Sequence, residues 1–475
     1  MSSTFGSLNA ATTALWAQRR ALDVTGQNIS NVNTDGYSRQ RVDLQAMGGS
    51  VVPAFFSTSN GIGSGVSADD VTRIRDAFLE GRGHTEHANN ARLTVESDTY
   101  DLVQQAVREP GDTGIQSLMS DMWAGWEDVA NQPQDEAARG QLLQRLQSLV
   151  SGIHTTQASL SAQWTQQRDN LDVLVADVNS AASSIAGLNK AIQQANQTGL
   201  PANDLADQRD VLVMKLADQV GATVRPGKFG SVDVIVGGMT LVAGSTASTL
   251  ATAGTYSADG MTGVDGPPRI VMGSGGYRVR AGGTAEGTLN ALTTIIPTYR
   301  TNLDNTAVSL ATSLNAAHTA TGAAFDLDGA AGTPLLGSSG GPITAASLSV
   351  LISDPRKIAA SSVPGPAAGV GALDHGNADK IAQLRQSTTG TDANYRKMIV
   401  ELGVQASVVA RNVDIQSVIT TQVDASRESV AGVNIDEEMT NMLSFQHAYS
   451  AAGRLVTAID ETLDTLINHT GLVGR

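Results

Sequence analysis

The sequence predicts a mainly α-helical protein with inserted β structure: N- and C-terminal helices that form a coiled-coil domain, a long-helix bundle domain and small β-rich inserted domains. Three observations lead to this fold class. Apolar side chains recur at seven-residue spacing near both ends, long helix-forming stretches fill much of the middle, and two stretches change to a β-like texture. A length of 475 residues exceeds one ordinary domain, so we expect two to four domains.

The first apolar stripe begins at the N-terminus. Its large side chains stand seven residues apart, which is the repeat of a helix that packs against another helix along one seam. They are Leu8, Leu15, Leu22 and Ile29, with Ala11, Thr25 and Val32 at the companion positions. We expect this stripe to form one half of an assembly interface.

The second stripe stands at the opposite end of the chain and is more regular. Its members alternate spacings of three and four residues, the pattern of a coiled-coil seam. They are Met442, Phe445, Tyr449, Ala452, Val456, Ile459, Leu463 and Leu466. Asn434 is the expected N-cap of this helix. A helix over residues 435–469 would be about 50 Å long at 1.5 Å per residue, and its apolar stripe would need a partner.

The economical partner is the N-terminal stripe, which would make the two ends one domain and the rest an insertion. The first stripe runs into Asn28, Asn31 and Asn33 and then into Asp35-Gly36. Asparagine and glycine tolerate positive φ, and the "YSRQRVDL" that follows alternates like a strand. We therefore expect a helix that ends in this segment and leads into a β-hairpin.

The middle of the chain alternates between helical and β-rich stretches. Helix is predicted over residues 88–107, 114–131, 136–196, 203–219, 286–318 and 377–429. Residues 223–280 have the texture of strands broken by glycines, and residues 322–374 are rich in Gly, Ser and Pro. The predicted domains are 1–45 with 432–475 (terminal coiled coil), 46–222 with 286–318 and 376–431 (helical), 223–285 (inserted β) and 319–375 (Gly/Ser/Pro-rich, β-containing).

Composition excludes several classes of partner and site. The formal charge is −15, and the absence of any Lys/Arg run argues against nucleic acid and anionic membranes. The absence of cysteine excludes disulfides, thiolate catalysis and Cys-ligated metals. The N-terminus lacks a basic segment followed by a continuous apolar run, and no window offers the roughly 18 apolar residues of a membrane span. The partners are therefore expected to be other proteins.

Three groups of polar residues could suggest an active or metal site, and each lacks a required part. His84 and His87 stand three residues apart without a third ligand nearby, so we interpret them as a solvated helix start. The calcium-loop-like "DLDG" at 326–329 lacks the required Gly and Glu at its sixth and twelfth positions, so we expect an ordinary turn. The acid pair Asp204 and Asp207 fits a helix start with a solvated face. We expect no catalytic residue, cofactor or metal.

The two ends of the chain resemble a known family. The segment "ALDVTGQNISNVNTDGYSRQRVDL" at 21–44 resembles the N-terminal signature of bacterial flagellar axial proteins, the rod, hook and hook-associated group. The ending from residue 429 onward, with "NIDEEM", resembles that of the hook-associated protein 1 family, which forms the first junction between hook and filament. The resemblance continues inward through "LPANDLADQRDVLVMKLADQVG" at 200–221, whereas residues 237–280 depart from the family pattern.

This resemblance implies a function and a set of partners. The chain would polymerise at the distal end of the hook and adapt hook to filament. It would associate with itself in a ring, and contact the hook protein and the second junction protein, hook-associated protein 3. The resemblance also implies a flagellar export chaperone, type III export without a cleaved signal, and an extracellular location in the flagellum.

Two other functions stay open at the level of sequence. One is a hook or distal-rod axial protein, although the long helical block at 88–219 and the "NIDEEM" ending favour the junction family. The other is a secreted cell-wall hydrolase with axial-type ends, supported only by the acidic charge and the Gly-rich region at 322–376. A catalytic insert should carry a dense acidic or histidine cluster, and the sequence shows none.

Overall fold

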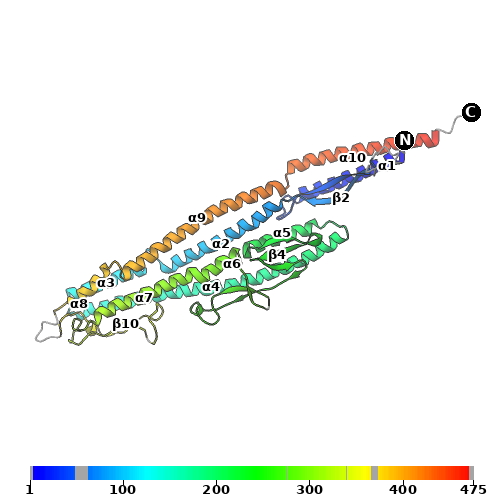
Figure 1. Cartoon of the computed structure of the whole chain (residues 1–475). Helices are drawn as coiled ribbons and strands as arrows, with labels where there is room; N and C mark the ends of the chain where they lie inside the picture. Colours follow the sequence, from blue (N-terminus) through cyan, green and yellow to red (C-terminus); the bar gives the residue numbers. More distant parts are fainter. Residues whose placement is uncertain (1–3, 49–62, 274, 339, 365–372, 470–475) are drawn as a thin grey trace, which may run out of the picture. The chain divides into compact units, whose positions relative to one another are not determined.

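The computed structural model describes residues 4–48, 63–273, 275–338, 340–364 and 373–469. It is mainly helical, as predicted (Figure 1). The α-helices are α1 (Thr4–Ser30), α2 (Ala77–Val107), α3 (Ile115–Asn131), α4 (Glu136–Gln197), α5 (Asn203–Val220), α6 (Gly283–Asn290), α7 (Ile296–His318), α8 (Gly376–Gln383), α9 (Thr391–Ala431) and α10 (Ile435–Asp464). The 77–87 part of α2 was not predicted, and the last predicted turns of α10 form a π-helical segment, Thr465–His469.

The strands form small antiparallel sheets. β1 (Gln40–Met47) pairs with β2 (Gly65–Arg73), which confirms the hairpin predicted after the asparagine-rich segment. The inserted strands are β3 (Thr223–Pro226), β4 (Val232–Val236), β5 (Met239–Ala243), β6 (Thr246–Ala247), β7 (Leu250–Ala253), β8 (Arg269–Met272), β9 (Tyr277–Arg278), β10 (Leu336–Gly337) and β11 (Ser349–Val350). They are ordered β3-β4-β5-β6, β7-β8-β9 and β10-β11 in three sheets.

The chain divides into two compact units. Unit 1 contains residues 1–87, 179–248 and 418–475, and unit 2 contains residues 88–178 and 249–417. The division falls inside the predicted β domain at 223–285, because the sheet β3–β6 belongs to unit 1 and the sheet β7–β9 to unit 2.

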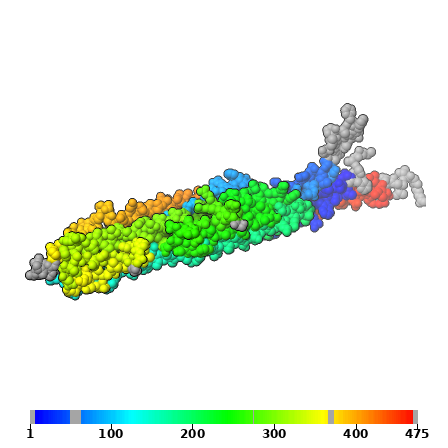
Figure 2. All heavy atoms as spheres, turned by 60° about the horizontal axis from the view of Figure 1, so that its bottom comes forward, coloured from blue at the N-terminus to red at the C-terminus, as the bar shows by residue number. Residues whose placement is uncertain are grey.

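Unit 2 is a helical bundle with a large aromatic core. Trp123, Trp126 and Trp164 are almost fully buried, and the Trp123 indole N–H donates to Asp392 Oδ2 at 2.8 Å. The long helix α4 is apolar enough over one 18-residue window to cross a membrane by composition alone. A core helix passes the same test, and α4 buries Leu142 and its neighbours at helical spacing. Figure 2 shows α9, in orange, at the surface of this unit.

Unit 1 brings the two ends of the chain together. α1 and α10 lie side by side in opposite directions, so the start of α1 and the end of α10 are neighbours (Figure 1). The hairpin β1–β2 packs against α1. The face of α1 that these neighbours bury is small, because its most buried residues are Ala11, Ala17, Ala21, Thr25 and Asn28. Small side chains allow a helix, a second helix and a hairpin to approach closely.

Candidate assembly interface

The predicted stripe residues lie along the α1–α10 pair, with different degrees of burial. Ile459 is 8% exposed and is the most buried of them. The half-buried members are Leu8, Leu15, Leu22, Ile29, Met442, Phe445, Val456 and Leu463. Tyr449 and Leu466 are 42% and 53% exposed. The structure therefore places these residues at the edges of a narrow seam whose centre on α1 is alanine, and a single chain leaves part of their apolar surface open.

A buried polar cluster joins the two ends of the chain beside this seam. We call it the terminal clasp, and it consists of Asn28, Tyr37, Arg39, Gln40 and Glu438. Asn28 Nδ2 donates to the Gln40 carbonyl at 2.9 Å and to Glu438 Oε2 at 3.1 Å. Asn28 Oδ1 accepts from the Gln40 N–H at 3.0 Å and from the Tyr37 hydroxyl at 2.8 Å. Asn28 is 1% exposed, and its side chain uses both donors and accepts two hydrogen bonds.

Arg39 provides the charge of the clasp. Its Nε donates to Glu438 Oε1 at 2.7 Å and its Nη1 to Glu437 Oε2 at 2.8 Å. Its backbone N–H donates to the Ala431 carbonyl at 2.8 Å. The two carboxylates stand in the first turn of α10, where the helix dipole favours negative charge. The Asn434 side chain caps the same turn by accepting from the N–H groups of residues 436 and 437, which confirms the predicted N-cap.

The turn that leads into the clasp requires glycine. Gly36 has φ +75°, and the Tyr37 N–H closes the turn on the Thr34 carbonyl at 3.1 Å. The ring of Tyr37 is partly buried beside Asp204, Asp207 and Glu438, and burial together with these charges raises its pKa to about 12. Tyr37 therefore stays a neutral hydrogen-bond donor to Asn28 at any physiological pH.

We expect Gly36→Ala to destabilise the clasp and Gly26→Ala to do the opposite. An added Cβ at Gly36 would clash with Val211 Cγ2, and alanine in the left-handed region alone costs about 1–2 kcal/mol. Gly26 lies inside α1 with nothing within 4 Å of its added Cβ, so alanine there should stabilise by about 0.5–1 kcal/mol. Hydrogen exchange of the amides of residues 28–40 measures the stability change caused by each substitution. Equal effects of the two substitutions would contradict this account.

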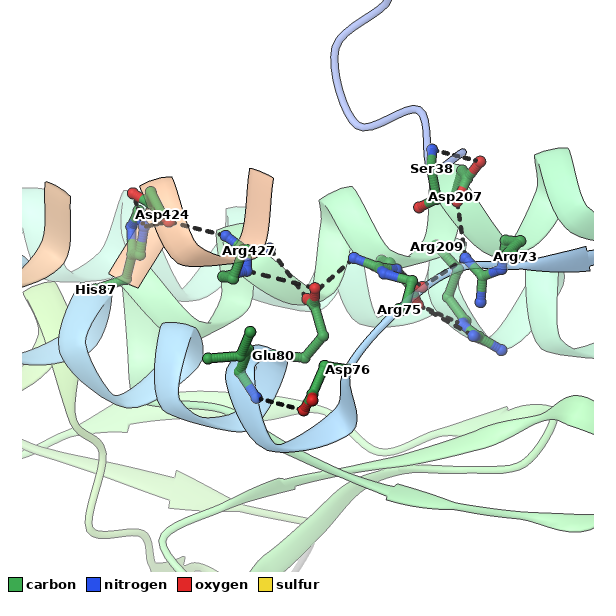
Figure 3. Close-up of polar contacts among 12 residues, drawn as sticks. Ser38, Arg73, Arg75, Asp76, Glu80, His87, Asp207, Arg209, Asp424 and Arg427 are labelled. Atoms are coloured by element: carbon green, nitrogen blue, oxygen red, sulfur yellow. Dashed lines mark hydrogen bonds and ion pairs between the residues drawn. The ribbon is translucent and has the colours of Figure 1, made fainter. Parts of the chain in front are cut away.

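A row of alternating charges continues from the clasp across unit 1 (Figure 3). This charged row consists of Arg73, Arg75 and Arg427 with Asp207, Asp210, Glu80 and Asp424. Asp207 begins it, because its Oδ2 accepts from the Ser38 N–H at 3.2 Å and its Oδ1 from Arg73 Nη1 at 2.8 Å. Asp207 is 6% exposed, so the prediction that it lies on a solvated face is wrong. It is buried because Arg73 of β2 packs against α5 and pairs with it.

Glu80 is the centre of the row and joins two arginines. Its Oε2 lies 3.0 Å from Arg75 Nη2 and 3.0 Å from Arg427 Nη2. Arg427 also binds Asp424 at 2.9 Å. Arg209, Arg73 and Arg75 outweigh the effect of burial and hold the pKa of Asp210 below its usual range. The row thus fixes the end of β2, the starts of α2 and α5 and the end of α9 to one another with partly buried ion pairs.

His87 lies at one end of the charged row. Its Nδ1 lies 3.2 Å from Asp218 Oδ1, and its Nε2 lies 2.9 Å from Asp424 Oδ2. Hydrogen bonding to Asp218 and the charge of Asp424 raise the pKa of His87 above its usual value near 6.5. The neighbouring His84 is 5% exposed, and burial lowers its pKa. The solvated helix start predicted for this pair is therefore wrong, because both residues lie inside α2, His84 is buried, and His87 pairs with carboxylates of α5 and α9.

We expect the stability of this part of unit 1 to fall as pH rises past neutrality. The pKa of His87 is higher in the folded chain than in the unfolded chain, so protonation of His87 favours folding. The stability that this protonation adds is fully present below about pH 6.5, and it is lost as pH rises through the raised pKa. Thermal unfolding at several pH values should show this slope in the parent chain and in His447→Gln, an exposed control. His87→Gln should remove it. An unchanged slope in His87→Gln would contradict the assignment.

The calcium-like segment at 326–329 is a turn that holds its own cations. Asp326 Oδ1 accepts from the N–H groups of residues 328 and 330, at 3.0 and 2.8 Å. Lys357 Nζ lies 3.1 Å from Asp326 Oδ2 and 3.0 Å from Asp328 Oδ2, and Arg356 also binds Asp328. The two carboxylates thus bind basic side chains of the same unit. Among the residues that the structure describes, no group of three His, Asp or Glu side chains could hold a metal ion.

Several exposed apolar residues of unit 1 were not predicted as part of an interface. On the terminal helices they are Trp16, Ile435, Met439, Leu443 and Leu455. Trp16, Met439, Leu443 and Leu455 stand off the seven-residue stripes, so periodicity assigns them to the polar faces. Ile435 lies seven residues before Met442, in line with the second stripe, but was not included in it. Two signals could have drawn attention to them: Trp16 is one of only four tryptophans, and residues 435, 439 and 443 recur every four positions.

Comparisons with known proteins agree with this arrangement. Residues 100–336 match the family model of the flagellar hook-associated protein FlgK helical domain. Residues 8–37 match the flagella basal body rod protein model, and residues 425–469 match the flagellar basal body rod FlgEFG protein C-terminal model. The two rod-protein matches therefore fall on the helix pair of unit 1 and include Asn28, Tyr37 and Glu438 of the clasp.

Relatives that align along nearly their whole length support a single family. Flagellar hook-associated protein 1 of Bacillus subtilis is 30% identical over 100% of both chains, and that of Escherichia coli is 25% identical over 97% of this chain and 99% of the relative. A solved structure of the flagellar hook junction protein FlgK from Burkholderia pseudomallei shares the fold, with a TM-score of 0.62 over 74% of this chain and 100% of that chain at 17% identity. From the match along its whole length, this chain belongs to the flagellar hook-associated protein 1 family.

Proposed function

We propose that this chain is a structural subunit of the bacterial flagellum that polymerises at the distal end of the hook, forms the hook-filament junction and adapts hook to filament. The observation that carries the proposal is the α1–α10 pair. The two segments that match rod-protein families lie at opposite ends of the sequence, and the terminal clasp joins them into one element with apolar surface left open. Such a surface needs further subunits to cover it.

The partners follow from this place in the flagellum. The chain would associate with further copies of itself in a ring, and contact the hook protein on one side and the second junction protein, hook-associated protein 3, on the other. A flagellar export chaperone would hold it before type III export, which uses no cleaved signal, and its final location would be extracellular. Residues 1–45 with 432–475 would be the assembly domain, because they contain the helix pair and the clasp.

We further propose that the chain has no catalytic function. The polar clusters that could resemble an active site are occupied by internal partners: Glu80 by two arginines, His87 by two carboxylates, and Asp326 by backbone N–H groups and Lys357. Charges that stabilise each other across four segments are typical of a structural connection.

Deletion of the gene followed by electron microscopy tests the junction function. Cells without this chain should make hooks that carry no filament, and the full-length chain should restore the filaments. A hook or distal-rod protein would instead be needed for the hook itself, so loss of hooks would contradict the proposal. A cell-wall hydrolase would leave filaments on every completed hook and change the cell wall.

A further inference from the structure

Trp16 dominates the side of α1 that faces away from the seam. It is 72% exposed, although tryptophan is usually among the most buried residues. Arg19 and Arg20 follow it by three and four positions and therefore share its helix face. A groove of about 750 Å³ opens beside these three residues, with Met47 and Val66 of the hairpin on its other wall. Tryptophan and arginine beside a groove are the composition of an interaction hot spot.

The outward side of α10 has the complementary composition. Met439 and Leu443 are 54% and 55% exposed and stand four residues apart. Asp436 precedes them on the same face. Along its whole length α10 carries six carboxylates against a single arginine, Arg454, whereas α1 carries two arginines against one aspartate. One face is thus aromatic and basic, and the other is aliphatic and acidic.

These charges are also available for a partner. Every other arginine of unit 1 that the structure describes, from Arg39 to Arg427, has a carboxylate within ion-pair distance. The exceptions are Arg19, Arg20 and Arg454, all on the terminal helices. In the described part of the chain Asp436 has no ion-pair partner either. In a unit where arginine is otherwise paired, this pattern indicates ion pairs that form outside the single chain.

We propose that the α1 face with Trp16, Arg19 and Arg20 binds the α10 face with Asp436, Met439 and Leu443 of a second copy of this chain. The inference rests on the proposed function and names the surfaces through which the copies meet. The Met439 and Leu443 side chains cover the indole and enter the groove beside it, and the arginines pair with Asp436. Burying an exposed indole and two aliphatic side chains together stabilises the contact through removal of apolar surface from water.

The contact joins two different faces, and this determines the form of the assembly. Within a copy, each face points away from the seam between α1 and α10. A copy can therefore use its α1 face on one neighbour and its α10 face on another. Such head-to-tail contacts propagate into a closed ring or a helical tube, whereas a face that bound its own kind would stop at a dimer.

Cross-linking between introduced cysteines tests the proposal cleanly, because the natural chain has none. Thr12→Cys lies on the α1 face, Thr440→Cys lies on the α10 face, and both positions are exposed. Flagella carrying each full-length variant would be treated with a bis-maleimide and examined on denaturing gels. The double variant should give a ladder of multimers. Each single variant should give monomer only, since its cysteine faces none on the neighbouring copy.

The outcomes separate this inference from the function on which it rests. Dimers from a single variant would overturn the inference, because like faces would then meet. A double variant that yields no multimers from flagella with normally attached filaments would also overturn it, and would leave the junction function intact. If the unsubstituted chain were absent from the junction, the proposed junction function and the proposed contact between copies would both be wrong.

A second measurement does not depend on cross-linking geometry. Trp16→Ala should reduce the fraction of hooks that carry filaments towards that of the deletion strain, while the thermal midpoint of the isolated chain stays unchanged. Leu200→Ala is the matched control, because Leu200 is also largely exposed in unit 1 but lies far from α1 along the chain, between α4 and α5. Normal filament attachment in Trp16→Ala would overturn the inference.

Discussion

Arg39→Met should separate the two ends of the chain from each other and destabilise the α1–α10 pair by about 3–5 kcal/mol, the usual cost of breaking a buried ion pair by removing one partner. The Glu438 side chain is only 3% exposed and would retain a single hydrogen-bond donor, Asn28 Nδ2. A buried carboxylate without a cation takes up a proton or opens the structure to reach water. Hydrogen exchange of α1 and α10 in the full-length chain measures the loss.

Arg41→Met is the matched control for this substitution. Arg41 lies two residues further along β1 and pairs with Asp43 at 3.2 Å, but its side chain is mostly exposed. Exposed ion pairs contribute about 0–1 kcal/mol, so Arg41→Met should change exchange little. Combining Arg39→Met with Glu438→Gln should recover much of the lost stability, because the buried charge is then absent. A loss in the double variant as large as in Arg39→Met alone would show that the ion pair is not the cause.

The terminal clasp also shows how far sequence reasoning reaches. The heptad stripes predicted that the two ends form one element, and Asp35-Gly36 predicted the turn into a hairpin. The asparagine-rich segment was interpreted only as a helix end. Asn28 instead lies in the interior, because its hydrogen bonds reach Glu438, 410 positions away. Local pattern cannot reveal a partner at that separation, since each residue alone is also common on a solvated face.

The burial of side chains on α1 illustrates a second limit of prediction from sequence. The large residues of the stripe predicted where α1 meets α10, yet the most buried positions are alanines such as Ala17 and Ala21. The reason is that α1 has a helix on one side and a hairpin on another, so close approach selects small side chains between them. The seven-residue repeat identifies a contacting face, but it does not tell how many neighbours the helix has.

The charged row was missed for a related reason. Arg73 and Arg75 lie at the end of a strand, Asp207 and Asp210 at the start of a helix, and Arg427 near the end of another. In sequence each has the appearance of an ordinary surface charge. Only the fold brings these ends together, and it then removes most of the water around them.

Ile459→Asp should abolish assembly without removing the fold of unit 2. Ile459 is the most buried side chain of the predicted stripe, and an aspartate there would place an unpaired charge inside the α1–α10 seam. The helix pair would open, and the surface offered to other subunits would be lost. Cells with this variant should make hooks without filaments, as in the deletion strain, when examined by electron microscopy.

Ala458→Asp is the control, because Ala458 is the preceding residue of α10 and is exposed. The Ala458→Asp variant carries the same added charge on the same helix turn, but its carboxylate stays in water. It should therefore leave most hooks with filaments. Ile459→Val should also be tolerated, since loss of one buried methylene costs about 0.5–1.5 kcal/mol.

Secretion of each variant into the medium must be measured in the same cells, because the ends of the chain are also the expected contact of the export chaperone. If Ile459→Asp is secreted at the parental level and still attaches filaments at the parental frequency, the seam is not required for assembly. If it is secreted and filaments are absent, the defect lies in the seam itself.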